Sequence, residues 1–193
     1  MKQPKKLKKI VIFASGNGTN AINIYHYFNK VEGISVSHIF SNNAKAKVLK
    51  KANDLGITAI QFDKESFYST TELLDYIEVL QPDLIVLAGF LWKIPSNFIK
   101  AFPKKIINIH PALLPQYGGK GMYGEKVHKA VIKDGATKSG ITIHYVNEVY
   151  DEGEIIAQYH LDVASDDNHK TLAEKIHSLE YKHFPKEIHK LLS

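Results

Sequence analysis

The sequence has 193 residues, of which 44% are hydrophobic and 23% are charged, as is typical of a folded globular chain and not of a disordered one. It contains no cysteine, which excludes disulfides, thiolate metal sites and cysteine nucleophiles. The net charge of +5 equals the contribution of five lysines in the first nine residues, and the chain has no arginine, so we expect a basic tail and no nucleic-acid-binding face.

The first half of the chain alternates strand-like and helix-like segments. Apolar runs predict strands over residues 9–14, 34–41, 58–61, 82–90 and 105–110. Helical spacing of apolar residues predicts helices over 19–30, 44–55 and 66–80. Asn43 is expected to cap the second helix, and Gly56 follows its end. Strands separated by helices predict an α/β fold, a Rossmann-like, doubly wound and mostly parallel sheet with helices on both faces.

The second half of the chain has a different character. Residues 110–123 form a long loop rich in proline and glycine, followed by a predicted helix near 124–134. The segments 139–146 and 154–163 are expected to form an antiparallel pair at the edge of the sheet. A last helix is expected over 169–192, with a kink at Pro185. We expect a disordered basic tail at 1–8 and one catalytic domain over 9–193.

Segments that would direct the chain into or across a membrane are not indicated. The longest apolar run, Leu84 to Trp92, is far shorter than a membrane span, and the lysine-rich start lacks the apolar segment of a signal peptide. We therefore expect a cytoplasmic protein without a membrane partner.

The stretch "ASGNGTN" at 14–20 joins the first strand to the first helix. Gly16, Gly18 and Ala21 match a loose dinucleotide-binding pattern, but no carboxylate follows the second strand at 40–43, and no arginine is present for a ribose phosphate. The Gly-Lys-Ser/Thr of a nucleoside-triphosphate loop is absent too. A helix N-terminus with free N–H groups suits one phosphate monoester, and the alternative is a tight turn without a ligand.

The stretch "INIHPALLP" at 107–115 ends a predicted strand. Asn108 and His110 lie two residues apart and should face the same side, while Ile107 and Ile109 face the core. An amide and an imidazole that face one point can stabilise an oxyanion and move a proton.

A third group should orient the imidazole. Candidate carboxylates are Asp151, Glu152 and Glu154 in the turn "VYDEGE". A metal site from His110, His144 and Asp151 is an alternative that the spacing does not favour, so no metal is predicted. The remaining histidines are expected on the surface or on helix faces: His26, His128, His160, His169, His183 and His189.

Four motifs together resemble one enzyme family. "SGNGTN", "PDLIVLAGF", "NIHPALLP" and "YDEGEII" occur in the order and spacing of the phosphoribosylglycinamide formyltransferases, and the resemblance covers about residues 8–192. It implies the formyltransferase fold and a folate-dependent step of purine biosynthesis. The formyl group of 10-formyltetrahydrofolate would pass to the primary amine of glycinamide ribonucleotide, without a metal and without a covalent enzyme intermediate.

The resemblance also implies roles for individual residues. Asn108 and His110 would stabilise the tetrahedral intermediate, with His110 as general acid, and Asp151 would support His110 and pass a proton through water. The other roles fall into two groups, one for each substrate. Substrate-binding residues would be Gly18, Thr19, Asn20, His177 and Glu180, and folate-binding residues would be Leu91, Trp92, Lys93 and Ile94, with Asn108. The loop at 116–123 would lie over the substrate.

The chain departs from the family pattern on the folate side. Where better-known members carry an arginine, this chain has "DKESF", so the matching position is Ser66, with Lys64 as a substitute. The usual Met-Arg pair after "AGF" is replaced by Leu91 and Trp92, and "QYGGKGMYG" is longer and richer in glycine than the common loop.

Several other functions remain as alternatives. Formyltetrahydrofolate deformylase, sugar-nucleotide formyltransferase and methionyl-tRNA formyltransferase share the catalytic motif, but the first and last are expected to carry an added domain. The glycine loop is not expected in the sugar-nucleotide enzymes. A non-catalytic anion-binding module of the Rossmann type would explain the loop but not the convergence of Asn108, His110 and Asp151. We expect small-molecule substrates, no nucleic acid, and a monomer or homodimer.

Overall fold

The fold is built on a seven-stranded sheet with the strand order β3-β2-β1-β4-β5-β6-β7, in a computed structural model that describes residues 7–193. The strands are β1 (Lys8–Phe13), β2 (Ile34–Ser41), β3 (Thr58–Gln61), β4 (Leu84–Leu87), β5 (Ile106–His110), β6 (Lys138–Tyr145) and β7 (Ile155–Asp162). Strands β1 to β5 pair in parallel, whereas β6 pairs antiparallel with both β5 and β7. The predicted doubly wound, mostly parallel sheet with an antiparallel edge pair is confirmed.

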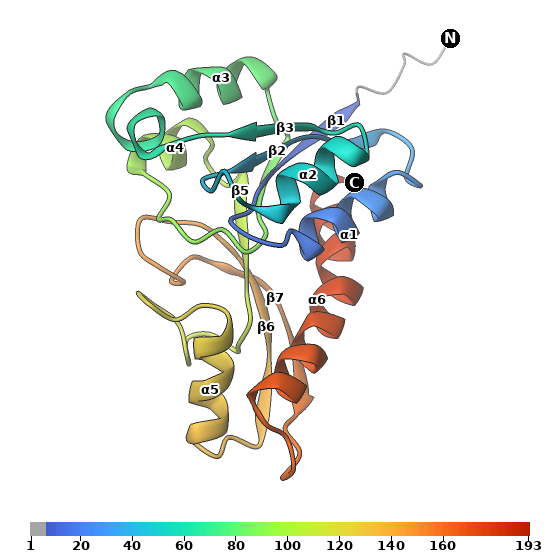
Figure 1. Cartoon of the computed structure of the whole chain (residues 1–193), viewed down its shortest axis with the longest axis vertical. Coiled ribbons are helices and arrows are strands. Elements are labelled where there is room, and N and C mark those ends of the chain that lie inside the picture. The colour runs from blue at the N-terminus through green and yellow to red at the C-terminus, as the bar shows by residue number, and fades with distance from the viewer. Residues whose placement is uncertain (1–6) are drawn as a thin grey trace.

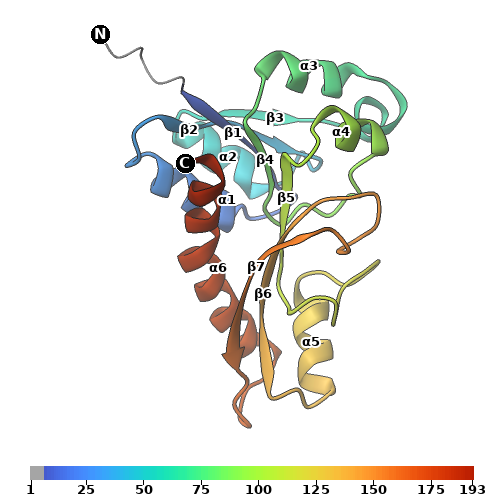
Figure 2. The same cartoon turned by 180° about the vertical axis from the view of Figure 1, so that it is seen from behind.

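Helices cover both faces of the sheet (Figures 1 and 2). They are α1 (Thr19–Phe28), α2 (Lys47–Asp54), the π-helix η1 (Glu65–Ser69), α3 (Glu72–Leu80), α4 (Ser96–Ala101), α5 (Glu125–Lys133) and α6 (His169–Leu192). One buried cluster contains residues of α1, α2, α5 and α6, and a second contains residues of η1, α3 and α4. The sheet therefore separates two apolar layers.

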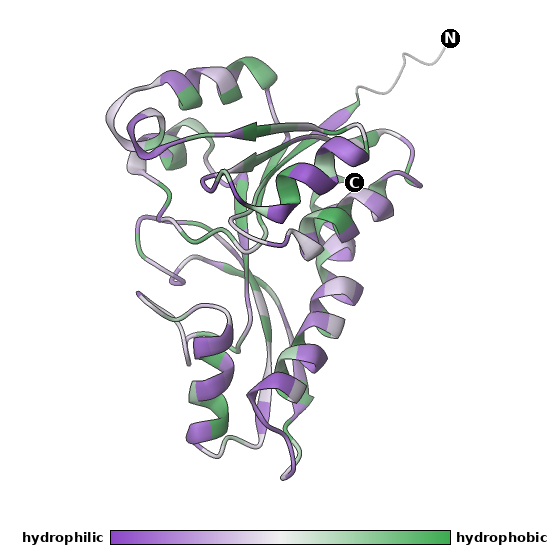
Figure 3. Ribbon diagram, in the orientation of Figure 1, coloured by the Kyte–Doolittle hydropathy of each residue, from purple (hydrophilic) through white to green (hydrophobic). Residues whose placement is uncertain are grey.

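Strand β1 illustrates why the central strands are apolar throughout. Ile10 and Ile12 pack in the first cluster, and Val11 and Phe13 pack in the second. Because alternate side chains point to opposite faces, a strand covered on both faces has to be apolar at every position. Figure 3 shows the same distribution, with hydrophobic residues along the central strands and a mixture of both kinds along the helices.

Two of the predicted helices differ from the structure, and one helix of the structure was not predicted. Helix α2 begins at Lys47 and not at 44, and its N-cap is Ala46, so the prediction of Asn43 as cap is wrong. Asn43 instead accepts the N–H of Lys45 in a turn before the helix. The helix predicted over 66–80 is divided into η1 and α3, because Thr70 is extended between them. Helix α4 was not predicted.

The last helix has the predicted bounds, and it continues through Pro185, which is buried within it. None of the helices in the described part of the chain is both long and apolar enough to cross a membrane. Of the basic tail expected at 1–8, residues 1–6 lie outside the described residues, and Lys8 already belongs to β1.

Candidate active site

A cavity of about 640 Å³ opens at the carboxyl ends of β1, β4 and β5. This is where open α/β sheets hold their ligands, and the volume is within the usual range for a small-molecule site. The site residues expected from the sequence all line it: Gly18, Thr19, Asn20, Leu91, Trp92, Lys93, Ile94, Asn108, His110, Asp151, His177 and Glu180. Their individual roles remain predictions.

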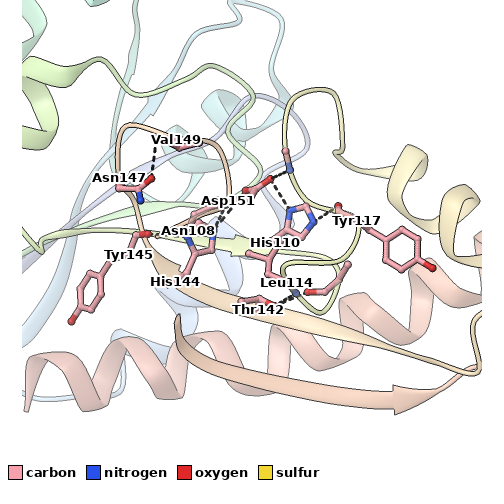
Figure 4. Close-up of polar contacts among 12 residues, drawn as sticks. Asn108, His110, Leu114, Tyr117, Thr142, His144, Tyr145, Asn147, Val149 and Asp151 are labelled. Carbon is pink, nitrogen blue, oxygen red and sulfur yellow. Dashed lines mark hydrogen bonds and ion pairs between the residues drawn. The ribbon is translucent and has the colours of Figure 1, made fainter. Parts of the chain in front are cut away.

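The imidazole of His110 is buried, and both of its nitrogens have polar partners, the Tyr117 carbonyl and Asp151 (Figure 4). Its Nε2 lies 2.8 Å from the carbonyl oxygen of Tyr117, so Nε2 carries the proton and donates it. Its Nδ1 lies 3.6 Å from Oδ2 of Asp151. Burial lowers the pKa of His110, although Asp151 and the Tyr117 carbonyl oppose that effect. Nδ1 is therefore the nitrogen free to take up and release a proton.

The carboxylate of Asp151 is fixed between a loop and two histidines. Its Oδ2 accepts the N–H of Gly119 at 2.9 Å, and its Oδ1 lies 3.7 Å from Nε2 of His144. The backbone of Asp151 has φ 58°, a left-handed conformation that is uncommon for a residue with a side chain. Such strain is typical of functional sites, where the surrounding structure holds a side chain in a required position.

The amide of Asn108 is oriented by His144, which lies opposite it on β6. Nδ1 of His144 donates to the carbonyl oxygen of Tyr145 at 2.8 Å, and burial lowers the pKa of this histidine. Neutral His144 thus presents an acceptor at Nε2, to which Nδ2 of Asn108 donates at 3.2 Å. The second N–H of the Asn108 amide is left for an oxyanion in the cavity.

Sequence reasoning missed parts of this site. It considered His144 only as a metal ligand, because its position opposite Asn108 depends on the register of β5 and β6. It expected His128 only as a surface or helix-face residue, whereas His128, on α5, is buried and lines the cavity. Among residues 7–193, no group of three His, Asp or Glu side chains has a geometry that could hold a metal ion.

The glycine loop also lines the cavity, at the start of α1. Gly18 is the N-cap of α1 with φ 67°, and no side chain caps this helix end. A Cβ on Gly18 would collide with the side chain of Val48 on α2, so packing and backbone conformation both require glycine here. Gly16 has no atom near the position of a Cβ, and it borders the cavity. The uncapped N–H groups suit an anion.

Two predicted binding residues contact each other beside this loop. Nδ2 of Asn20 donates to Oε2 of Glu180 at 2.8 Å, so the amide donor of Asn20 is directed at a carboxylate. Burial raises the pKa of Glu180, whereas Asn20 and His177 oppose the shift.

The side of the cavity that residues 91–94 line rests on an aromatic cluster. The ring of Trp92 lies near Phe62, Phe67, Tyr68 and Phe90, with ring centroids 5.8 to 6.5 Å from its own. Nζ of Lys64 lies 5.8 Å from the centroid of the Trp92 ring. The hydroxyl of Ser66 instead donates to Oδ1 of Asp63 at 2.8 Å. The structure therefore brings Lys64, and not Ser66, to the residues that line the cavity.

The loop at 116–123 lines the cavity and contacts both His110 and Asp151. Residues 119–124 line the cavity, and Gly118 lies against Asp151, where an added Cβ would be 3.3 Å from Cβ of Asp151 and 2.6 Å from Cδ2 of Leu114. The same loop supplies the carbonyl that holds His110 and the N–H that holds Asp151. The conformation of this loop and the positions of the His110 and Asp151 side chains are thus linked.

Comparisons with known proteins identify the family. The family model described as formyl transferase matches residues 8–188. The chain belongs to the formyl transferase family. It is similar to the chloroplastic phosphoribosylglycinamide formyltransferase of Arabidopsis thaliana, with 41% identity over 93% of this chain, and to the phosphoribosylglycinamide formyltransferase of Bacillus subtilis, with 32% identity over 96% of this chain and 95% of that protein.

Solved structures support the same grouping. This formyl transferase matches the glycinamide ribonucleotide transformylase 1 of Geobacillus kaustophilus with a TM-score of 0.88 and 30% identity, over 97% of this chain and 100% of that one. The Arabidopsis thaliana and Vigna unguiculata proteins are longer, and the chain spans 63% and 56% of their lengths.

Proposed function

We propose that this formyl transferase moves the formyl group of 10-formyltetrahydrofolate to the primary amine of N1-(5-phospho-D-ribosyl)glycinamide. The products would be formylglycinamide ribonucleotide and tetrahydrofolate, as in the third step of de novo purine biosynthesis. The observation that carries the proposal is that one cavity joins a loop suited to a phosphate monoester with Asn108, His110 and Asp151. Relatives named for this reaction support it.

The reaction proceeds by direct attack. The amine nitrogen adds to the formyl carbon, and the negative charge that develops on the formyl oxygen is stabilised by the free N–H of Asn108. The attacking nitrogen loses a proton, which Asp151 passes through water to Nδ1 of His110. When the carbonyl re-forms, the bond from the formyl carbon to N10 of the folate breaks, and N10 takes up a proton from His110.

The tautomer of His110 specifies which atom transfers that proton. Nε2 is committed to the Tyr117 carbonyl, so Nδ1 accepts the proton and delivers it to N10. In the unliganded enzyme, burial keeps the pKa of His110 low. The oxyanion and Asp151 both favour the imidazolium, so His110 gains its proton as negative charge develops.

The folate binds along residues 91–94. Leu91, Trp92 and Ile94 supply apolar surface for a ring system, and Lys93 supplies a positive charge. Nζ of Lys93 lies 5.8 Å from the ring centroid of Tyr150, and Lys64 lies over Trp92. The two ammonium groups suit the carboxylates of a folate, with Lys64 as the expected substitute for the arginine of the family.

An assay with three acceptors tests the proposal. Purified protein and 10-formyltetrahydrofolate are mixed with glycinamide ribonucleotide, with water alone, or with a sugar-nucleotide amine. We expect tetrahydrofolate to form only with the ribonucleotide. Release with water alone would indicate a deformylase, release with the sugar nucleotide a different transferase, and no release at all a non-catalytic module.

Three further expectations from the sequence remain proposals. These are a single catalytic domain over residues 9–193, a cytoplasmic location, and a monomer or homodimer that binds only small molecules.

A further inference from the structure

Two asparagines on α1 make matched contacts with α6. Asn20 and Asn23 lie three residues apart, so they share a face of the helix. Nδ2 of Asn20 donates to Oε2 of Glu180 at 2.8 Å, and Nδ2 of Asn23 donates to the carbonyl oxygen of Tyr181 at 3.0 Å. Asn20 and Glu180 line the cavity, whereas Asn23 and Tyr181 do not. Substitutions of the two asparagines can therefore be compared, to distinguish an effect on the packing of α1 against α6 from an effect on the cavity.

Glu180 depends on Asn20 for a hydrogen-bond donor. The residue is 6% exposed, and burial raises its pKa because a carboxylate loses hydration. The N–H of Asn20, from α1, and the imidazole of His177, from α6, favour the ionised form. His128 on α5 borders the same cavity, and its interaction with His177 brings a third titratable group into the cluster.

The two polar atoms of the Asn20 amide have different surroundings. Its Oδ1 is buried and finds no hydrogen-bond partner among residues 7–193. A buried polar atom without a partner destabilises the folded state, whereas the hydrogen bond from Nδ2 pairs the buried carboxylate of Glu180. The contact with Glu180 is what the amide contributes.

We propose that Asn20 is a positioning residue that fixes the carboxylate of Glu180 toward the ribonucleotide, and that it does not bind the phosphate itself. The proposal rests on the proposed function, because the ribonucleotide is the ligand that Glu180 receives. Glu180 accepts a hydrogen bond from a donor of that substrate, and the phosphate is held by the backbone N–H groups at the start of α1. Asn20 thereby couples the phosphate loop to α6.

Steady-state kinetics of Asn20→Ala and Asn23→Ala test this assignment. We expect the KM for the ribonucleotide to rise roughly ten- to a hundredfold in Asn20→Ala, the range for a lost hydrogen bond to a charged group, with a smaller change in kcat. Asn23→Ala should have nearly the wild-type KM. An equal rise in both variants would mean that Asn20 only docks α1 on α6, and would overturn the proposal.

A substrate without the phosphate separates the two roles of Asn20. In Asn20→Ala, the relative loss should be the same for the ribonucleotide and for the corresponding ribonucleoside. A loss confined to the phosphorylated substrate would show that Asn20 binds the phosphate. In a Glu180→Ala background, Asn20→Ala should add no further rise in KM, and additive effects would contradict an action through Glu180.

A pH titration provides a readout that needs no turnover. Because Asn20 stabilises the ionised carboxylate, its removal should raise the pKa of Glu180 further, as measured by carbon-13 NMR of the labelled side chain. Asn23→Ala should leave that pKa where it is in the wild type. An unchanged pKa in Asn20→Ala would overturn the proposal. A wild-type enzyme that titrates as expected but transfers no formyl group would contradict only the proposed function.

Discussion

At the scale of single residues, the site is organised around the free nitrogen of one imidazole. The Tyr117 carbonyl fixes Nε2 of His110, and Asp151 stands 3.6 Å from Nδ1. A second histidine, His144, orients the amide of Asn108. Each group that would touch the reacting atoms is thus held by a further group behind it, so that little reorganisation is needed during the reaction.

The substitution His110→Ala should remove the proton transfer to N10. We expect kcat to fall by roughly 10²- to 10⁴-fold, the usual contribution of general acid–base catalysis. Formyl transfer is measured with saturating substrates, and circular dichroism checks that the fold is retained. His160→Ala, at an exposed position on β7, serves as control. Normal turnover in His110→Ala would exclude the proposed mechanism.

The substitution Asp151→Asn keeps the shape of the side chain and removes its charge. An oxygen remains to accept the N–H of Gly119, so the loop contact can persist. We expect kcat to fall while the KM of both substrates changes little, because the charge acts on the protonation of His110 and on proton transfer. Single-turnover kinetics check this prediction. A rise in KM at constant kcat would instead assign Asp151 to substrate binding.

Substitutions of Lys64 and Ser66 form a matched pair that tests the proposed folate contacts. Lys64→Ala should raise the KM for 10-formyltetrahydrofolate several-fold, roughly the effect of losing about 1 kcal/mol of charge and cation–π interaction. Ser66→Ala should leave that KM near the wild-type value, because its hydroxyl bonds to Asp63. The KM for the ribonucleotide serves as internal control. The opposite order of effects would assign the missing arginine's role to position 66.

At the scale of elements, the glycine loop is shaped by the helix packed behind it. Gly18 lies against Val48 of α2 and has a left-handed backbone. Gly18→Ala should therefore destabilise the fold by about 2 to 5 kcal/mol through strain and overpacking. Gly16→Ala, where a Cβ meets open space, should change the stability by less than about 1 kcal/mol. Urea unfolding measures both, and equal losses would contradict the argument.

The sequence correctly predicted those helices and strands whose bounds follow from local apolar periodicity. Strands over 34–41 and 58–61 and the last helix over 169–192 have the predicted bounds, because their apolar periodicity and flanking residues agree. The predicted start of α2 was wrong because Asn43 forms a turn with Lys45 and does not cap the helix. Thr70, with φ −116° and ψ 178°, divides η1 from α3, and nothing in the helical periodicity indicated that break.

The site was predictable where its residues lie close together in the sequence. Asn108 and His110 share one strand, and their spacing alone places them on one face. His144 and His128 could not be assigned in this way. His144 depends on the pairing of β5 with β6, and His128 depends on the burial of α5 against the cavity.

At the scale of the whole molecule, the fold buries several histidines, and burial favours their neutral form. His110, His128 and His144 are buried, and burial lowers the pKa of each. A histidine that stays neutral in the folded chain but gains a proton in the unfolded chain favours unfolding in acid. The burial of these side chains therefore makes the fold sensitive to acid.

His128 provides the clearest test of this linkage. Burial and the nearby His177, His110 and His169 lower its pKa from 6.5 to about 4, although Glu125 opposes the shift. Above pH 6.5 neither state binds the proton. Between pH 6.5 and about 4 only the unfolded chain does, so the free energy of unfolding falls by about 1.4 kcal/mol per pH unit for this one group.

The substitution His128→Asn should remove that dependence. The variant loses packing and has a lower absolute stability. Between pH 6 and 5, however, the slope of its free energy of unfolding against pH should be smaller than that of the wild type, by the equivalent of about one bound proton. Urea unfolding at several pH values measures the slope, and His26→Asn, exposed on α1, should keep the wild-type slope. An unchanged slope in His128→Asn would mean that His128 takes up its proton without unfolding, which its burial against α6 and the cavity argues against.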